Sequence, residues 1–445
     1  MSDLLSIGAS GVRAYQTALT TTSENIANAG NASYVRRSAT IREVQASNGF
    51  NSSLNGMGAV VDGIARNGSP YLEASVRSAS SDAKKTEAST VWLERIEGAM
   101  TGGALSTNLT GFFAASTALQ AEPTSSALRA GMLGSAATLA DSFKVTAKAL
   151  DDGMAELDTK AQQTVGELNR LGQALLKVNQ GIVKSQPGSS AAAGLADQRD
   201  DLLTQMSALT EVDVQIDDFG RATVRAGASN GPVLVDPREA SEMSYARTGG
   251  NAVLNVLKPS GVAIQANPEG GALAGMIEGA QRIAATRDQL GAIATDLTTG
   301  VNDLQKQGQD LTGAQGQPFF ANTSDPADFK VALTDGSQIA AAKTGGGARD
   351  SSNLAALASL RTGNQFESKV QALTTDNAAT LKQRRLVGDA QTAIYDGAVT
   401  ARSEASGVNL DSEAVDLVRF QQAYQASSRV IQVARETFQS ILEIR

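Results

Sequence analysis

The chain has 445 residues, of which 41% are hydrophobic, 19% are charged and 4% are aromatic, and its formal net charge is -8. That length is enough for about three domains, and the acidic excess disfavours binding to a phosphate backbone, so we expect no nucleic-acid partner. The sequence contains neither His nor Cys, which excludes Ser-His and Cys-His nucleophile pairs, disulfides and nearly all zinc sites. We expect no catalytic residue, no cofactor and no metal.

The N-terminal segment contains an apolar residue at every seventh position, at Leu5, Val12, Leu19 and Ile26. This heptad spacing predicts a helix that packs as in a coiled coil. Glycines inside that helix each cost about 1 kcal/mol relative to Ala, so the helix should be weak alone and needs a partner. No basic segment with a long apolar run precedes it, and we therefore expect neither a cleavable signal nor membrane insertion.

Apolar residues at helical spacing predict further helices along the chain. One extends from Leu72 to Met100, and a very long helix, or two in line, extends from Leu128 to Ile182. At about 1.5 Å per residue, the second pattern covers roughly 80 Å. Two more helices are predicted over residues 277–304 and 366–394, so the middle of the chain should be rod-like.

A β insert interrupts these helical patterns after Leu209. Val212, Val214 and Ile216 alternate with polar residues, and a turn then leads into a second alternating run, which predicts a β-hairpin. Short strands are also predicted at residues 233–235, 253–257 and 329–333, and the segments 185–194 and 345–347 are predicted to be linkers or turns.

The C-terminal segment repeats the seven-residue spacing of the N-terminus, with Leu410, Leu417, Tyr424, Ile431 and Phe438 in register. An ordinary amphipathic helix packed on its own globular domain is the alternative for either end. Because both ends carry the same narrow apolar stripe, we favour two seams that pack against one another. The predicted fold class is mainly α with a small β insert (α+β), a long helical bundle with coiled-coil-forming terminal helices.

The predicted domain organisation follows from these changes of pattern. Residues 1–66 and 404–445 form the two halves of a terminal coiled-coil core domain, 67–208, 271–312 and 347–403 form a helical rod domain, 209–270 form a small outward β-rich domain, and 313–346 pack with it.

Adjacent charged pairs are the remaining candidates for chemistry. The acid pairs lie at residues 151–152, 200–201 and 217–218, and the Arg pairs at 36–37 and 384–385. Adjacent side chains on a helix point about 100° apart and do not face each other. We therefore interpret the first two acid pairs as solvated, the third as part of a turn, and both Arg pairs as surface residues.

Five segments of the chain resemble a known family. The run from Glu24 to Arg36 is similar to the signature of bacterial flagellar rod, hook and hook-associated proteins, and the run from Gln198 to Leu209 resembles the internal signature of the hook-associated protein 1 sub-family. The segments 270–275, 308–320 and 406–431 also resemble that sub-family. The expected family-motif residues are Asn25, Asn28, Tyr34, Gln198, Arg199, Asp200 and Asn409.

The resemblance implies a structural role without catalysis. It implies a subunit of the junction between flagellar hook and filament, exported through the flagellar type III system, transiently cytoplasmic and finally part of the extracellular flagellum. The implied partners are identical subunits in a ring, the hook protein, a second hook-associated junction protein on the filament side and a cytoplasmic export chaperone that binds the C-terminal helix. Another axial subunit, such as a hook, rod or flagellin-like filament protein, is the alternative, and an enzyme within the β insert is a second one.

The two terminal seams are the expected assembly interface. Its residues are Leu5, Val12, Leu19, Ile26, Leu410, Leu417, Phe420, Tyr424, Ile431, Phe438 and Ile441.

Overall fold

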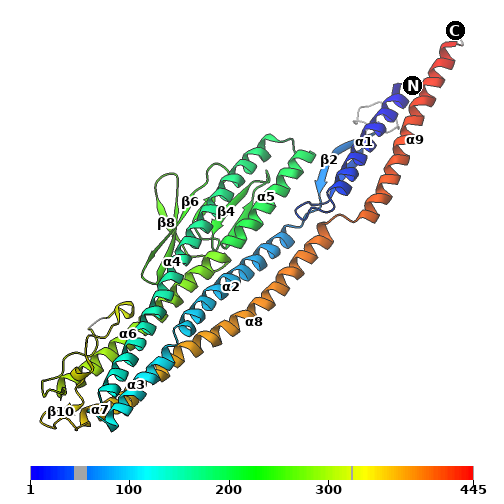
Figure 1. The fold of residues 1–445 in the computed structure, drawn as a ribbon. Helices are drawn as coiled ribbons and strands as arrows, with labels where there is room; N and C mark the ends of the chain where they lie inside the picture. The colour runs from blue at the N-terminus through cyan, green and yellow to red at the C-terminus, as the bar shows by residue number, and fades with distance from the viewer. Residues whose placement is uncertain (1, 45–57, 322–323, 444–445) are drawn as a thin grey trace.

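The computed structural model describes residues 2–44, 58–321 and 324–443. The molecule is elongated and consists mostly of long helices (Figure 1). At one end the first helix, α1 (Ser2–Ala27), lies against the last one, α9 (Leu410–Glu443), and the two chain termini lie at this same end. The helices between them form a helical body with small sheets beside it. The predicted fold class, mainly α with a small β insert, is confirmed.

The helical body is dominated by four long helices. The longest, α4, has 59 residues and is about 90 Å long, so the pattern that starts near Leu128 is one helix rather than two. Helix α2 packs on α6 on one side and on α8 on another. The helices of the body in the described part of the chain are α2 (Pro70–Gly102), α3 (Leu105–Ala121), α4 (Ser126–Lys184), α5 (Ser190–Leu209), α6 (Gly271–Gln307), α7 (Ser352–Asn364) and α8 (Phe366–Ser406).

Serine caps explain where three of these helices begin. The side chains of Ser69, Ser125 and Ser189 each accept a hydrogen bond from the backbone N–H three residues later, which satisfies a donor that has no partner within the helix. The cap at Ser189 starts α5 within the segment 185–194. The prediction of a linker is therefore wrong for residues 190–194, because the cap and the alanines that follow it favour a helix.

The β insert forms two antiparallel sheets of three strands. The first contains β3 (Val212–Ile216), β4 (Ala222–Ala226) and β5 (Val233–Val235), and the second contains β6 (Glu242–Thr248), β7 (Asn251–Leu257) and β8 (Ala263–Ala266). The predicted hairpin is confirmed, with Val214 paired to Val224. Asn179 of α4 fixes this hairpin to the body, since its amide donates to the carbonyl of Ala222 at 2.8 Å and accepts from its N–H at 2.9 Å.

The end of the body far from the termini is held by an aromatic core. Phe329 is buried, and its ring lies 4.8 Å from those of both Phe143 and Phe320. Within residues 329–333, Val331 forms a single bridge to Phe320 and no strand is present. The strand predicted there is therefore wrong. The apolar residues of that run fill the core instead of a sheet ladder. The elements nearby are β9 (Gly308–Gln309), β10 (Ala342–Lys343) and the 3-10 turns η1 (Pro326–Asp328) and η2 (Gly336–Gln338).

A hairpin of β1 (Arg37–Glu43) and β2 (Ala59–Arg66) connects α1 to α2, and the sequence patterns missed it. It touches the turn between α4 and α5, where the N–H of Ile64 donates to the carbonyl of Gly188 at 2.7 Å. A Cβ added to Gly63 would lie 3.2 Å from the Cα of Gly188. This close backbone contact connects the hairpin to the body.

The close approach of α2 and α6 gives a first prediction. A Cβ added to Gly275 would lie 2.3 Å from the carbonyl oxygen of Lys85, whereas one added to Gly166 on α4 would meet nothing within 4 Å. We expect Gly275→Ala to lower stability by about 1–3 kcal/mol through overpacking. Gly166→Ala, the matched control, should raise it by about 0.5–1 kcal/mol through helix propensity. Thermal unfolding followed by circular dichroism measures both, and equal melting temperatures for the two variants would contradict the predicted packing.

Candidate functional site

Most of the family-motif residues meet where the α1 and α9 pair joins the helical body. We call this region the joint. It is made of Asn25, Tyr34, Arg36, Arg37, Arg66, Asp197, Arg199, Asp200 and Glu413.

Asn25 connects four segments of the chain at the joint. Its side chain is 1% exposed, and its Oδ1 accepts from the backbone N–H of Arg37 at 3.0 Å and from the hydroxyl of Tyr34 at 2.8 Å. Its Nδ2 donates to the carbonyl of Arg37 at 2.8 Å and to Glu413 Oε2 at 3.0 Å. The amide thus uses both of its donors and accepts two bonds, which is its full capacity. It joins α1, the turn after it, β1 and α9.

The first turn of α9 is held by a buried carboxylate. Glu413 is 1% exposed and accepts from Arg36 Nε at 2.5 Å in addition to Asn25. The backbone N–H of Arg36 donates to the carbonyl of Ser406, the last residue of α8. Asn409 caps α9, since its Oδ1 accepts from the N–H of Ser412 at 3.0 Å. The start of α9 is therefore fixed to the turn that follows α1.

Two aspartates of α5 hold the β1–β2 hairpin. Asp197 accepts from Arg37 Nη2 at 2.8 Å and from Arg66 Nε at 2.6 Å, so it bridges the two paired ends of β1 and β2. Asp200 lies 2.7 Å from Arg66 Nη1 and 2.8 Å from Arg199 Nη2. Arg199 Nη1 also donates to the carbonyl of Gly220 in the β3–β4 turn, at 2.5 Å. These contacts connect the β1–β2 hairpin to the body and to the β insert.

The electrostatics of the joint follow from this burial. Burial lowers the pKa of Arg66, but the carboxylates of Asp200 and Asp197 outweigh that effect and its net pKa is raised. Burial also raises the pKa of Tyr34 to about 12, so its hydroxyl stays a proton donor to Asn25. Both groups keep the protonation states that their hydrogen bonds require.

The joint corrects two interpretations of the sequence. Arg37 and Asp200 are buried. The predictions that Arg37 is a surface residue and that Asp200 is solvated are therefore wrong. The reason is that each finds an opposite charge from another part of the chain, which a local pattern cannot show. Asp197, Arg66 and Glu413 were missed as functional residues, although Asp197 directly precedes the motif residue Gln198.

The other motif residues lie at the edge of the joint. Asn28 donates through Nδ2 to the carbonyl of Glu24 at 2.8 Å and so caps the end of α1. Gln198 is exposed on α5. Neither side chain takes part in the buried network described above.

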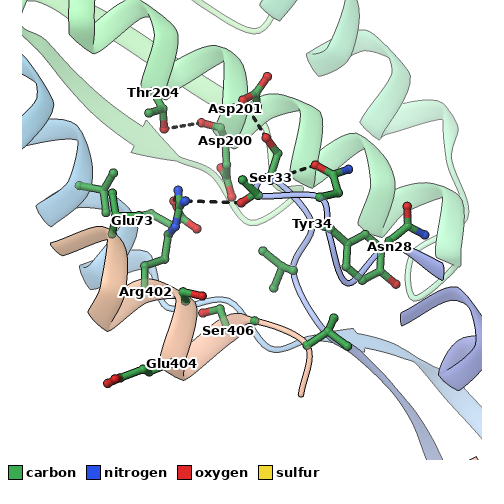
Figure 2. A pocket seen from close by; sticks show the side chains of 18 of the residues that line it. Asn28, Ser33, Tyr34, Glu73, Asp200, Asp201, Thr204, Arg402, Glu404 and Ser406 are labelled. Atoms are coloured by element: carbon green, nitrogen blue, oxygen red, sulfur yellow. Dashed lines mark hydrogen bonds and ion pairs between the residues drawn. The ribbon is translucent and has the colours of Figure 1, made fainter. Parts of the chain in front are cut away.

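A cavity of about 680 Å³ lies beside the joint. Figure 2 shows it between the turn that follows α1, helix α5 and the end of α8, with Ser33 hydrogen-bonded to Asp201. Arg402 of α8 donates to the carbonyl of Ala32 at 3.4 Å and lies 3.5 Å from Glu73. Within residues 2–44, 58–321 and 324–443, no cluster of three or more metal-binding side chains is present, and no helix is long and apolar enough to cross a membrane.

The two terminal helices pack through small residues. The pair is antiparallel: an added Cβ on Gly8 would lie 2.7 Å from Ile431, and one on Gly11 would lie 2.7 Å from Ser427 Oγ. Further along the pair, the ring centres of Tyr15 and Phe420 lie 6.5 Å apart. The glycines that weaken α1 alone therefore let the two helices approach closely.

The predicted interface residues are only partly covered in this pair. Leu410 and Phe438 are more than half exposed, and the side chain of Ile441 lies outside the described residues. The other predicted positions are partly buried, namely Leu5, Val12, Leu19, Ile26, Leu417, Phe420, Tyr424 and Ile431.

Comparison with known proteins agrees with this geometry. The family model described as the flagellar hook-associated protein FlgK helical domain matches residues 93–320, just over half of the chain. The chain belongs to this family. Residues 399–444 also match the C-terminal region of the flagellar basal body rod FlgEFG proteins. The resemblance stated from the sequence motifs is confirmed.

Individual relatives cover different shares of the chain. Flagellar hook-associated protein 1 of Salmonella typhimurium is 25% identical over 360 residues, which is 75% of this chain and 63% of that protein. The chain thus spans just under two thirds of the length of that relative. The protein of the same name from Bacillus subtilis is 24% identical over 485 residues, which is 96% of this chain and 95% of that protein. The flagellar hook junction protein FlgK from Burkholderia pseudomallei shares the fold, with a TM-score of 0.50 and 20% identity over 56% of this chain and 46% of that one.

The network around Asn25 gives the second prediction. Asn25→Ala leaves the buried carboxylate of Glu413 and the backbone of Arg37 without partners, and each unsatisfied group costs about 1–3 kcal/mol. We expect a lower melting temperature and faster amide hydrogen exchange in the first turn of α9. Asn28→Ala, which removes one partly exposed bond at the end of α1, is the matched control and should change both by much less. If the two variants behave alike, Asn25 does not hold the joint.

Proposed function

We propose that this chain is a structural subunit of the bacterial flagellum at the junction between hook and filament. It is exported by the flagellar type III system and assembles through α1 and α9. Membership of the hook-associated family supports the general role. The Burkholderia pseudomallei protein is named a flagellar hook junction protein, and the likeness of fold supports the same position here.

The observation that carries the proposal is the apolar surface that the terminal pair leaves uncovered. Phe438 is 51% exposed on the side of α9 that continues the packed face. On the other side of α9, Val415, Val418 and Val433 are also exposed. A helix with apolar residues on both faces cannot bury them against one neighbour, and contiguous exposed apolar surface marks an interaction site. More copies of the pair would cover both faces.

The proposed partners follow from this role. They are identical subunits in a ring, the hook protein on one side, a second hook-associated protein on the filament side, and a cytoplasmic chaperone that shields α9 before export. A groove that accepts the apolar face of an amphipathic helix is the expected form of the chaperone contact. The finished subunit would lie outside the cell in the flagellum.

A rod, hook or filament subunit is the second candidate. The match of residues 399–444 to the C-terminal region of rod proteins favours it for that segment. The match of residues 93–320 to the hook-associated helical domain covers far more of the chain and supports the junction role over it.

Phe438 and its neighbour provide the test. We expect Phe438→Asp to abolish filament attachment when it replaces the native subunit in flagellated cells, because a charge would enter an apolar contact. Gln439→Asp, on the adjacent exposed position, is the matched control and should preserve filaments. The measurements are filament counts by electron microscopy and the amounts of flagellin and of the variant itself in the medium.

The two secretion measurements separate the two proposed roles of α9. A variant that reaches the medium but supports no filaments has lost assembly, whereas one that stays in the cell has lost the export contact. Wild-type filament numbers with Phe438→Asp would show that the junction is held elsewhere.

A further inference from the structure

The second half of α8 turns its apolar side to solvent. At 100° per residue, eight small or apolar residues share one face, and within residues 379–401 that face has no charged side chain. Leu386 is 64% exposed and Ile394 is 63% exposed. We call this surface the α8 face. It consists of Ala379, Leu386, Val387, Ala390, Ala393, Ile394, Gly397 and Ala401, with one exposed polar residue, Gln383, among them.

The opposite side of the same helix packs on the body through polar contacts. Arg384 pairs with Glu278 of α6 at 2.9 Å, and Arg385 pairs with Glu94 of α2 at 2.7 Å. Within residues 382–405 of α8, no side chain belongs to the buried apolar core. An ordinary surface helix has the reverse arrangement, with its apolar stripe toward the core. The α8 face is therefore not explained by the folding of a single chain.

We propose that the α8 face is a lateral contact with a second copy of this chain, which binds it through a different surface. The inference rests on the proposed function, because a ring places copies side by side and uses head-to-tail contacts between unlike surfaces. Ala390, Ala393 and Gly397 lie along the middle of the face, and their small side chains let a neighbouring helix approach closely.

Continuity with the terminal helices favours a second copy as the occupant. Figure 1 shows α8 and α9 in line along one edge of the molecule, with α2 and α1 packed against their inner sides. The side of α9 away from α1 also carries exposed apolar residues, Val415, Val418 and Val433, among charged ones such as Arg419 and Arg429. A neighbour that covers α9 would extend along the same edge onto α8.

The size of the α8 face agrees with a contact that forms only in the assembly. The 23 residues from 379 to 401 make a stripe about 33 Å long and roughly 10 Å wide, so it offers about 300 Å². A stable interface needs about 800 Å² on each partner. The α8 face alone cannot hold two free subunits together, but it adds to a contact once the terminal helices have aligned them.

Single cysteines test the proposal, because the native chain has none. In the purified full-length monomer, Ile394→Cys should react rapidly with a polar maleimide. In isolated hook-filament particles we expect its reaction to be at least about tenfold slower, since the centre of an interface excludes water. Thr392→Cys, exposed on the same helix but outside the α8 face, is the matched control and should react equally in both. Ala390→Cys repeats the measurement if Ile394→Cys fails to assemble.

A photocrosslinker identifies the occupant. Benzoylphenylalanine at position 394 in assembled particles should yield an adduct of twice the subunit mass, with both crosslinked peptides from this chain. An adduct with another protein, or equal reactivity of Cys at 394 and 392 in particles that contain the subunit at the junction, would overturn the inference while the proposed function stands. Immunogold labelling that places the chain away from the junction would overturn the proposed function itself.

Discussion

The hydrogen bonds of the Asn25 side chain set the register of the terminal helices. They place Asn25 opposite Glu413, and further along the pair Gly8 lies opposite Ile431. Seventeen residues separate Asn25 from Gly8, and eighteen separate Glu413 from Ile431. The two spacings are nearly equal, so the register fixed at the joint is kept along the length of both helices. A shift by one residue would move Ile431 and Ser427 out of the space that Gly8 and Gly11 leave for them, where an added Cβ would meet these side chains at 2.7 Å.

The ion pairs at the joint contribute geometry more than stability. Burying Asp197 and Asp200 with their Arg partners removes charges from water, and that desolvation cost offsets most of the attraction. Each guanidinium nevertheless has fixed donor directions, which an apolar contact lacks. Arg66 reaches both Asp197 and Asp200 of α5, so these ion pairs favour one angle between the β1–β2 hairpin and the body. Such a defined angle would suit the proposed role, in which the subunit fits a regular lattice.

Periodicity predicted most of the fold because long helices and a regular hairpin repeat their pattern over many residues. It failed where the partner is distant in sequence. Arg37 and Asp197 are 160 residues apart, and nothing local indicates that they meet. Helix α3 has 17 residues but no one-sided apolar stripe, and shorter elements such as α7 and the β1–β2 hairpin gave too few repeats to detect. The proposed division of the chain near residues 66, 208, 270, 312, 346 and 403 stays a prediction.

Gly8 and Gly11 show why local energetics can mislead about a site. Each glycine does weaken an isolated helix, yet in the pair the missing side chains make room for Ile431 and Ser427. The same reasoning applies to α8, where Ala390, Ala393 and Gly397 add little apolar area to the monomer surface. Before assembly, the small apolar area of each stripe limits contacts between copies, and the net charge of -8 on the whole chain favours solubility. In the proposed assembly, the same small residues would allow close helix contacts. A chain that must be soluble first and polymeric later can meet both demands by dividing its apolar surface into faces that are each too small to hold two copies alone.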